Sequence, residues 1–321
     1  MKNYKKSIIC AFLVFLFILI ILFCQKISND KREIICNTSY SSILGDKETG
    51  SLFDPFVSLK DNEYTMYVSY RNKRSIALSK SSDGINWSNP KIVLNFDEST
   101  GWEYDINRST VTKYNNKYYM YYTGQQGGIS KIGLAISEDG IEFSKYSKEP
   151  IMVPEFEYEK ESVMNPMVIF DEEEKIFKMW YSAGETYEPD VICYATSKDG
   201  IHFEKYNNPI FEPSNDKETL DYYKIGAVDI HKLSSDSYIM FYIGYTDIDT
   251  ARIFYATSKD GIVCKRYNKE ALVEPNIFSF AKDAVYKPSV VFLDNKNFNL
   301  YFNGRTKYHE YIGISKCKIN K

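Results

Sequence analysis

The sequence predicts an all-β protein, a five-bladed β-propeller of four-stranded antiparallel blades, and three observations lead to this expectation. The 321 residues include 28 tyrosines and are 16% aromatic, and aromatic side chains favour strands over helices. A short motif around Asp-Gly recurs at nearly constant spacing, and a tyrosine-rich apolar segment precedes each copy. A repeat of this length that holds several short strands is typical of propeller blades.

The recurring motif is Ser-x-Asp-Gly-Ile, and an aromatic residue follows it two positions later in three of its four copies. Its aspartates are Asp83, Asp139, Asp199 and Asp260. Glycine adopts positive φ in a turn at little cost, and the aspartate side chain accepts hydrogen bonds from the turn backbone. We therefore interpret the motif as a structural turn between the third and fourth strands of each blade, with no part in the site.

The tyrosine-rich segments predict the second strand of each blade, and they divide the chain into blades at about 46–100, 101–158, 159–217, 218–277 and 278–321. The fifth repeat ends before its fourth strand. We expect residues 26–45 to form a linker and a strand that closes the ring, because closure hides exposed sheet edges. Cys36 and Cys317 would then lie on neighbouring strands, where an exported chain could form a disulfide.

The N-terminal 25 residues predict a cytoplasmic stub and a membrane signal anchor. Lys2, Lys5 and Lys6 precede an apolar run over residues 8–24, which is long enough to cross a bilayer as a helix. Positive charge on the short side favours a cytoplasmic N-terminus and an extracellular propeller at the cell surface. A cleaved signal peptide, which would release a secreted protein, is the alternative.

The net charge and the spacing of the cysteines and histidines restrict the kinds of ligand and partner that we expect. A net charge of −3 and a pI of about 5.8 argue against a nucleic-acid partner. The cysteines and histidines show no spacing typical of a metal site, so we expect no metal and no other cofactor.

The residues at the start of each innermost strand are expected to face the central axis. Aligning the repeats places Asp54, Arg108, Asn165 and Lys287 there, whereas blade four offers Ala227 or Asp229. Asp54 would lie between Arg108 and Lys287, and nearby cations lower the pKa of a carboxyl group. We expect an ionised Asp54 that acts as a base or nucleophile. A buried ion-pair cluster that only holds the funnel together is the alternative.

Further acidic and aromatic residues stand near the blade entrances. Glycoside hydrolysis needs a second, protonated carboxyl group, and Glu161 has no cation at its own blade entrance. Aromatic rings can stack on sugar rings. We therefore predict a catalytic set of Asp54, Asp105 and Glu161, and a substrate-binding set of Arg108, Asn165, Lys287, Trp102, Asp283 and Asp229.

The repeats, Asp54-Pro55 in the first blade, and the acids of blades two and three resemble the five-bladed propeller glycosidases. These include glycoside hydrolase family 43 and the invertase and levansucrase families. The resemblance implies that Asp54 is the base or nucleophile, Asp105 a stabilising acid and Glu161 the acid. It implies a hydrolase acting on an extracellular oligo- or polysaccharide. The alternative is a non-catalytic propeller that binds carbohydrate or scaffolds surface-polysaccharide assembly.

Overall fold

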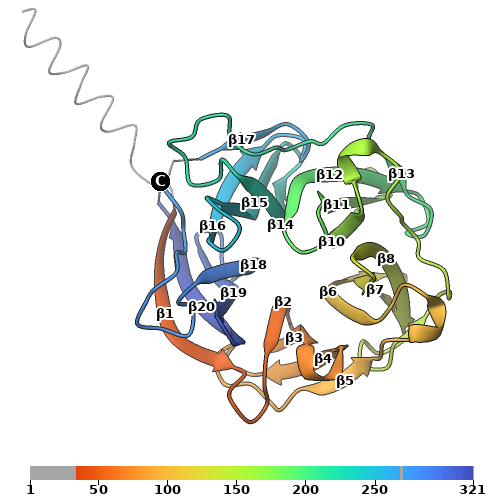
Figure 1. Cartoon of the computed structure of the whole chain (residues 1–321), viewed down its shortest axis with the longest axis horizontal. Coiled ribbons are helices and arrows are strands. Elements are labelled where there is room, and N and C mark those ends of the chain that lie inside the picture. The colour runs from red at the N-terminus through yellow and green to blue at the C-terminus, as the bar shows by residue number, and fades with distance from the viewer. Residues whose placement is uncertain (1–33, 268–269, 321) are drawn as a thin grey trace, which may run out of the picture.

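The computed structural model describes residues 34–267 and 270–320, and its regular structure is almost entirely antiparallel β-sheet. Its strands form five four-stranded blades that stand side by side around a central axis, as in a propeller, and two of the blades are joined into one eight-stranded sheet (Figure 1). Within these residues, three short 3₁₀ turns lie in the connections: η1 (Arg71–Lys73), η2 (Glu98–Thr100) and η3 (Glu157–Glu159).

The strands follow the chain from the innermost to the outermost position of each blade. Blades one and two contain β2 (Leu52–Lys60), β3 (Glu63–Tyr70), β4 (Ser75–Ser81), β5 (Lys91–Leu94), β6 (Asp105–Tyr114), β7 (Lys117–Gln126), β8 (Ile129–Ser137) and β9 (Ser144–Lys145). Blades three and four contain β10 (Ser162–Asp171), β11 (Ile176–Gly184), β12 (Pro189–Ser197), β13 (Glu204–Lys205), β14 (Lys224–Ser234), β15 (Ser237–Tyr245), β16 (Ala251–Ser258) and β17 (Cys264–Arg266). A single parallel bridge between β8 and β10 joins the second and third blades.

The fifth blade is built from both ends of the described chain. It contains β18 (Ala284–Phe292), β19 (Asn297–Thr306) and β20 (His309–Ile319), and β1 (Ile34–Leu44) pairs with β20 as its outermost strand. Cys36 lies directly opposite Cys317, and a disulfide joins them. The ring is therefore closed by a sheet ladder and by a covalent bond.

The Asp-Gly motifs form turns, and they also connect neighbouring blades. Asp83 Oδ1 accepts hydrogen bonds from the backbone N–H groups of Ile85 and Asn86, both at 2.8 Å. The carbonyl of each turn glycine accepts a hydrogen bond from a ring on the second strand of the preceding blade, by way of Tyr301, Tyr67, Tyr121 and Trp180. Much of the aromatic excess in the sequence thus stabilises the contacts between blades.

A second repeated contact ties each of three blades together internally. In the second blade the buried carboxylate of Glu103 accepts from the Tyr122 hydroxyl at 2.6 Å and from Lys145 Nζ. The third and fourth blades repeat this acid, tyrosine and cation as Glu159–Tyr181–Lys205 and Asp221–Tyr242–Arg266. These three acids precede the innermost strands of their blades, and their carboxylates are paired within the blade, which gives them a structural role.

Within the residues that the structure describes, no helix is long and apolar enough to cross a membrane. The predicted anchor at residues 8–24 lies outside those residues.

Candidate active site

One residue in each innermost strand has a left-handed backbone conformation at the same level of the ring. These residues are Asp54, Arg108, Asn165, Ala227 and Lys287, with φ angles of 51, 54, 52, 44 and 42°. Each lies where the pairing register shifts, which marks a β-bulge. A non-glycine residue in this region costs about 1–3 kcal/mol, and such strain gathers at functional sites. The bulges direct the five side chains toward one axis.

Side chains of the neighbouring blade hold the bulges in place. The backbone N–H of Asp54 donates to Asn303 Oδ1 at 3.2 Å, and the N–H groups of Arg108, Asn165 and Ala227 donate to hydroxyls of Ser69, Thr123 and Ser182. These acceptors occupy equivalent positions on successive second strands. Ala227 is therefore the axial residue of the fourth blade.

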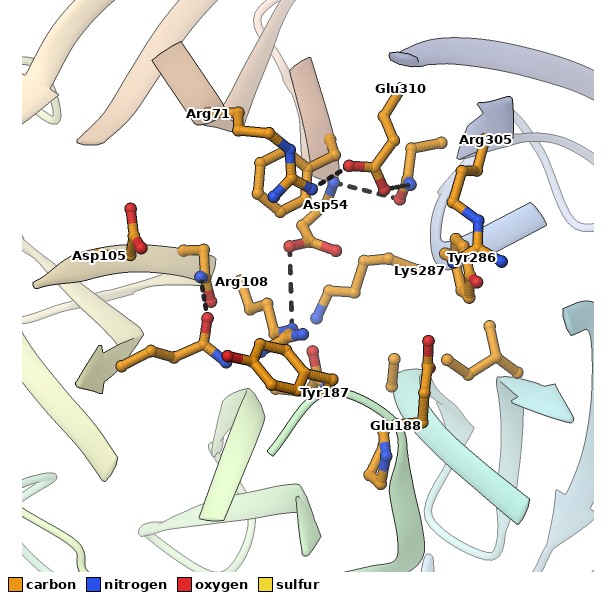
Figure 2. A pocket seen from close by; sticks show the side chains of 18 of the residues that line it. Asp54, Arg71, Asp105, Arg108, Tyr187, Glu188, Tyr286, Lys287, Arg305 and Glu310 are labelled. Carbon is orange, nitrogen blue, oxygen red and sulfur yellow. Dashed lines mark hydrogen bonds and ion pairs between the residues drawn. The ribbon is translucent and has the colours of Figure 1, made fainter. Parts of the chain in front are cut away.

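All five axial residues line one cavity of about 310 Å³, together with Asp105. Residues in or beside the connections between the second and third strands of blades one, three and five add charged and aromatic side chains to the cavity (Figure 2). They are Arg71, Arg74, Tyr187, Glu188, Arg305 and Glu310. The cavity is densely charged, which suits a ligand rich in hydroxyl or anionic groups.

Asp54 is buried at the centre of this arrangement, with 6% of its surface exposed. Its Oδ2 lies 4.0 Å from Arg108 Nε and accepts from the Ser69 hydroxyl at 3.3 Å. Burial raises the pKa of Asp54, and the positive charges of Arg108 and Lys287 oppose this only in part. The sequence-based expectation of a lowered pKa was wrong, because the loss of hydration outweighs the two cations.

Lys287 approaches Asp54 from the fifth blade and is 2% exposed. Burial lowers the pKa of Lys287 to about 8, although the carboxylates of Asp54 and Asp229 favour its charged form. Among the described residues, Lys287 Nζ has no hydrogen-bond partner, and neither do Arg108 Nη1 and the Tyr286 hydroxyl. Buried donors are rarely left unpaired, so a water molecule or a ligand in the cavity is the expected partner of these three groups.

Glu188 is another carboxyl group of the cavity whose pKa is raised by burial. It lies in the loop between β11 and β12, and Figure 2 shows it across the cavity from Asp54, with Lys287 and Arg108 between them. Burial raises the pKa of Glu188, opposed by the Tyr245 hydroxyl and more weakly by Arg108 and Arg305. Sequence reasoning missed Glu188 because the search followed the blade entrances, and no repeat marks this loop.

Asp105 and Glu310 occupy the rim. Burial raises the pKa of Asp105, and the charges of Arg74 and Arg71 oppose the rise. Glu310 pairs with Arg71 and also accepts a hydrogen bond from the Asn303 amide at 3.3 Å. Glu310 and Arg305 lie on β20 and β19 beside the turn that joins these strands, and Arg71 begins η1. Sequence reasoning considered none of these three positions.

The remaining predicted residues lie elsewhere. Glu161 is exposed outside the cavity, and its carbonyl accepts from the Ser130 N–H. Trp102 is buried against Tyr122 in a stacked arrangement and donates to the Lys148 carbonyl, so no sugar can reach it. Asp229 is buried behind the axial residues, 3.2 Å from His231, and Asp283 lines a separate groove.

No group of three or more His, Cys, Asp or Glu side chains suited to a metal ion occurs in the part of the chain that the structure describes. The ionisable groups of the cavity are carboxyl groups, guanidinium groups, one ammonium group and tyrosine hydroxyls. This set can transfer protons through Asp54 and Glu188, and it can hold anionic or hydroxyl oxygens through its cations.

Residues 79–301 match the family model described as the glycosyl hydrolases family 32 N-terminal domain. An uncharacterized protein of Mycobacterium tuberculosis is 27% identical over 205 residues, which cover 59% of this chain and 64% of that protein. A 1,2-beta-oligomannan phosphorylase from a Thermoanaerobacter species is 30% identical over 163 residues, 47% of this chain and 54% of the phosphorylase. The chain thus spans less than two thirds of the length of these relatives.

Solved structures share the fold. A thermostable family-43 glycoside hydrolase has a TM-score of 0.67 at 19% identity, with 87% of this chain and 92% of the other covered. A beta-1,2-mannobiose phosphorylase from Listeria innocua has a TM-score of 0.69 at 13% identity, with coverages of 88% and 97%. A structure described as a glycoside hydrolase has a TM-score of 0.74 at 18% identity, with coverages of 91% and 94%.

Proposed function

Because the chain belongs to the family described as the glycosyl hydrolases family 32 N-terminal domain, we propose that it cleaves glycosidic bonds in an oligo- or polysaccharide. The observation that carries the proposal is a pair of carboxyl groups, Asp54 and Glu188, that enter one axial cavity from different blades. Burial raises the pKa of both groups. Paired carboxyl groups around one cavity are the chemical requirement for glycoside cleavage.

The two carboxyl groups have different tasks in this proposal. Glu188, whose pKa burial raises, donates its proton to the glycosidic oxygen as that bond breaks. Asp54 acts in its ionised form at the anomeric carbon, as a base toward water or as a nucleophile. Arg108 and Lys287 stabilise the negative charge of Asp54 and position the sugar hydroxyls.

The pH dependence follows from these tasks. Activity should rise with pH as Asp54 loses its proton and fall as Glu188 loses its proton. Both pKa values lie above the ordinary 3.8 of Asp and 4.5 of Glu, so we expect a bell-shaped profile of kcat/KM whose optimum lies above those values. A profile that stays flat from pH 4 to pH 8 would contradict the two-carboxyl assignment.

Activity itself is tested with the purified full-length protein on oligosaccharides of arabinan, xylan, fructan and mannan. We expect release of shorter sugars from at least one series. Binding without turnover on every series would favour the alternative of a non-catalytic carbohydrate-binding or surface-polysaccharide scaffold propeller.

A second candidate function is phosphorolysis, in which phosphate takes the place of water. The unpaired donors Lys287 Nζ, Arg108 Nη1 and Tyr286 Oη favour it, because together they can hold an oxyanion. The Thermoanaerobacter relative is named as a phosphorylase. A phosphate oxygen would attack the anomeric carbon, the leaving oxygen would take the Glu188 proton, and a sugar 1-phosphate would form.

Lys287→Met tests this second candidate. A hydrogen bond to a charged group contributes about 1.5–3 kcal/mol, so the substitution should weaken phosphate binding about 10- to 100-fold. In the unaltered protein, phosphate binding should also weaken as pH rises through about 8, because Lys287 then loses its charge. Calorimetry with inorganic phosphate measures both effects, and Lys259→Met, at an exposed turn, is the control. Equal phosphate binding by all three proteins would exclude the assignment.

We further propose that the propeller lies outside the cell, anchored through residues 8–24 or secreted if that segment is cleaved. The disulfide between Cys36 and Cys317 supports an oxidising compartment. Protease added to intact cells should digest the propeller. Complete protection of the protein until the cells are lysed would contradict an external location.

A further inference from the structure

A second groove adjoins the cavity at Arg305, and we propose that this groove binds the outer sugar units of the glycan whose reacting bond lies in the cavity. The groove encloses about 910 Å³ between the β15–β16 loop, the β19–β20 loop and the segment that leads into β18. Arg305 lines both spaces. The inference rests on the proposed function, since it assigns the length of the substrate for the same site.

Arg305 forms the wall between the cavity and the groove, and its position is fixed from both sides. Its guanidinium group lies 5.2 Å from the centre of the Tyr286 ring, which faces the cavity (Figure 2). On the groove side its Nη2 donates to the Asp249 carbonyl at 2.8 Å. A ligand that crosses this wall therefore meets a fixed cationic donor. Such a donor can bind sugar hydroxyls in both spaces.

The volume of the cavity limits how much of a glycan it can hold. Small-molecule sites commonly enclose about 300–1,000 Å³, and the cavity of about 310 Å³ lies at the lower end of that range. The cavity therefore accommodates the sugars next to the reacting bond and little more. A longer glycan has to leave over the rim, and the groove offers it a path that begins at a residue of the cavity itself.

The surface of the groove combines exposed rings with hydroxyl-binding groups. Tyr308 is 75% exposed in the groove, and Phe278, next to the groove residue Ile277, is 92% exposed. Large apolar side chains clustered in this way mark an interaction site rather than a packing site. Aromatic rings can pack against the C–H face of sugar rings, a contact that buries apolar surface on both sides.

The polar groups of the groove complement these rings. Lys282 and Asp283 lie along it, so the predicted role of Asp283 in substrate binding is proposed here for the outer sugars. Arg252 also lines the groove, and its buried Nε has no hydrogen-bond partner among the described residues. The mixture of rings and charged donors and acceptors favours a glycan over an apolar protein surface.

The test compares short and long oligosaccharides. Disaccharides and hexasaccharides of arabinan, xylan, fructan and mannan are titrated by calorimetry into full-length protein that carries Glu188→Gln, so that no turnover intervenes. We expect a hexasaccharide to bind more tightly than the disaccharide of the same series. Tyr308→Ala and Phe278→Ala should each remove about 2- to 10-fold of hexasaccharide affinity and leave disaccharide affinity unchanged.

Tyr146→Ala is the matched control, because Tyr146 is an exposed ring that lines neither space. Equal losses for short and long sugars, an effect of Tyr146→Ala as large as that of Tyr308→Ala, or no binding of any hexasaccharide would overturn the groove assignment. Turnover by the unaltered protein, measured separately, decides the proposed function. If the unaltered protein cleaves a glycan but the groove variants bind long and short sugars alike, the groove assignment fails and the proposed function stands.

Discussion

Asp54→Asn is expected to lower kcat/KM on the glycan substrate by about 10²- to 10⁴-fold, the usual contribution of a positioned acid, base or nucleophile. The amide keeps the shape of the buried side chain and its contact with Ser69 but cannot accept a proton or attack an anomeric carbon. Initial rates measured with the identified oligosaccharide test this expectation. Sugar affinity by calorimetry and the thermal unfolding midpoint show whether the cavity stays intact.

Glu188→Gln should have an effect of similar size and a different signature. Because Glu188 supplies a proton, its removal should eliminate the falling limb of the pH profile at high pH and leave the rising limb. If Glu188 only positioned the sugar, the substitution would lower the rate and the fall in activity at high pH would remain.

Glu161→Gln is the matched control for Glu188→Gln. Glu161 was the acid expected from the sequence, but it is exposed and does not line the cavity. We expect activity within a factor of about two of the unaltered protein, as for surface substitutions that change stability by less than about 0.5 kcal/mol. A large loss with Glu161→Gln and none with Glu188→Gln would restore the sequence-based assignment.

Replacing both Cys36 and Cys317 by serine is expected to lower the free energy of unfolding by about 2–5 kcal/mol. The disulfide joins residues 281 positions apart, and the loss of chain entropy on cross-linking grows with the length of the closed loop. It also fixes β1 against β20, so the open ring would expose the edge of β20. Equilibrium unfolding in urea measures the change.

Cys264→Ser serves as the control, because Cys264 is a free cysteine on β17, in the fourth blade. Amide hydrogen exchange adds a local measurement. Without the disulfide, β1 should exchange faster than the innermost strands. Unfolding free energies that coincide for the disulfide variant and the unaltered protein would mean that the sheet ladder alone closes the ring.

The sequence predicted the fold well because repeats determine it. Each Asp-Gly turn and each tyrosine-rich second strand recurs, so every copy supports the others, and the missing fourth strand of the last repeat pointed to β1. The axial residues Asp54, Arg108, Asn165 and Lys287 were found for the same reason. They stand at one position of the repeat, where a bulge directs them to the axis.

The rest of the site lies where the repeats end. Glu188 comes from the loop between β11 and β12, and Arg305 and Glu310 flank the turn between β19 and β20. These loops between second and third strands differ in length and sequence from blade to blade. The backbone path that brings these loops over the cavity is set by the closed ring, and no local pattern encodes it. Trp102 was predicted to bind substrate because it is an aromatic residue near a blade entrance. In the structure it packs against Tyr122 instead.

The direction of the Asp54 pKa shift also required the structure. Sequence order correctly placed cations on both neighbouring blades, but the balance between charge and burial depends on depth and distance. At 4.0 Å from Arg108 Nε and almost without solvent contact, the carboxyl group loses more hydration than the cations replace.

The most direct test of the central claim is a crystal structure of the Glu188→Gln protein with a bound oligosaccharide of the series that the unaltered protein cleaves. We predict that the sugar enters the axial cavity with its glycosidic oxygen within hydrogen-bond reach of the residue 188 side chain. The anomeric carbon should face Asp54, and hydroxyl groups should contact Arg108 and Lys287. An oligosaccharide bound elsewhere on the propeller, with the cavity free of sugar, would contradict the assignment of Asp54 and Glu188 as the catalytic pair.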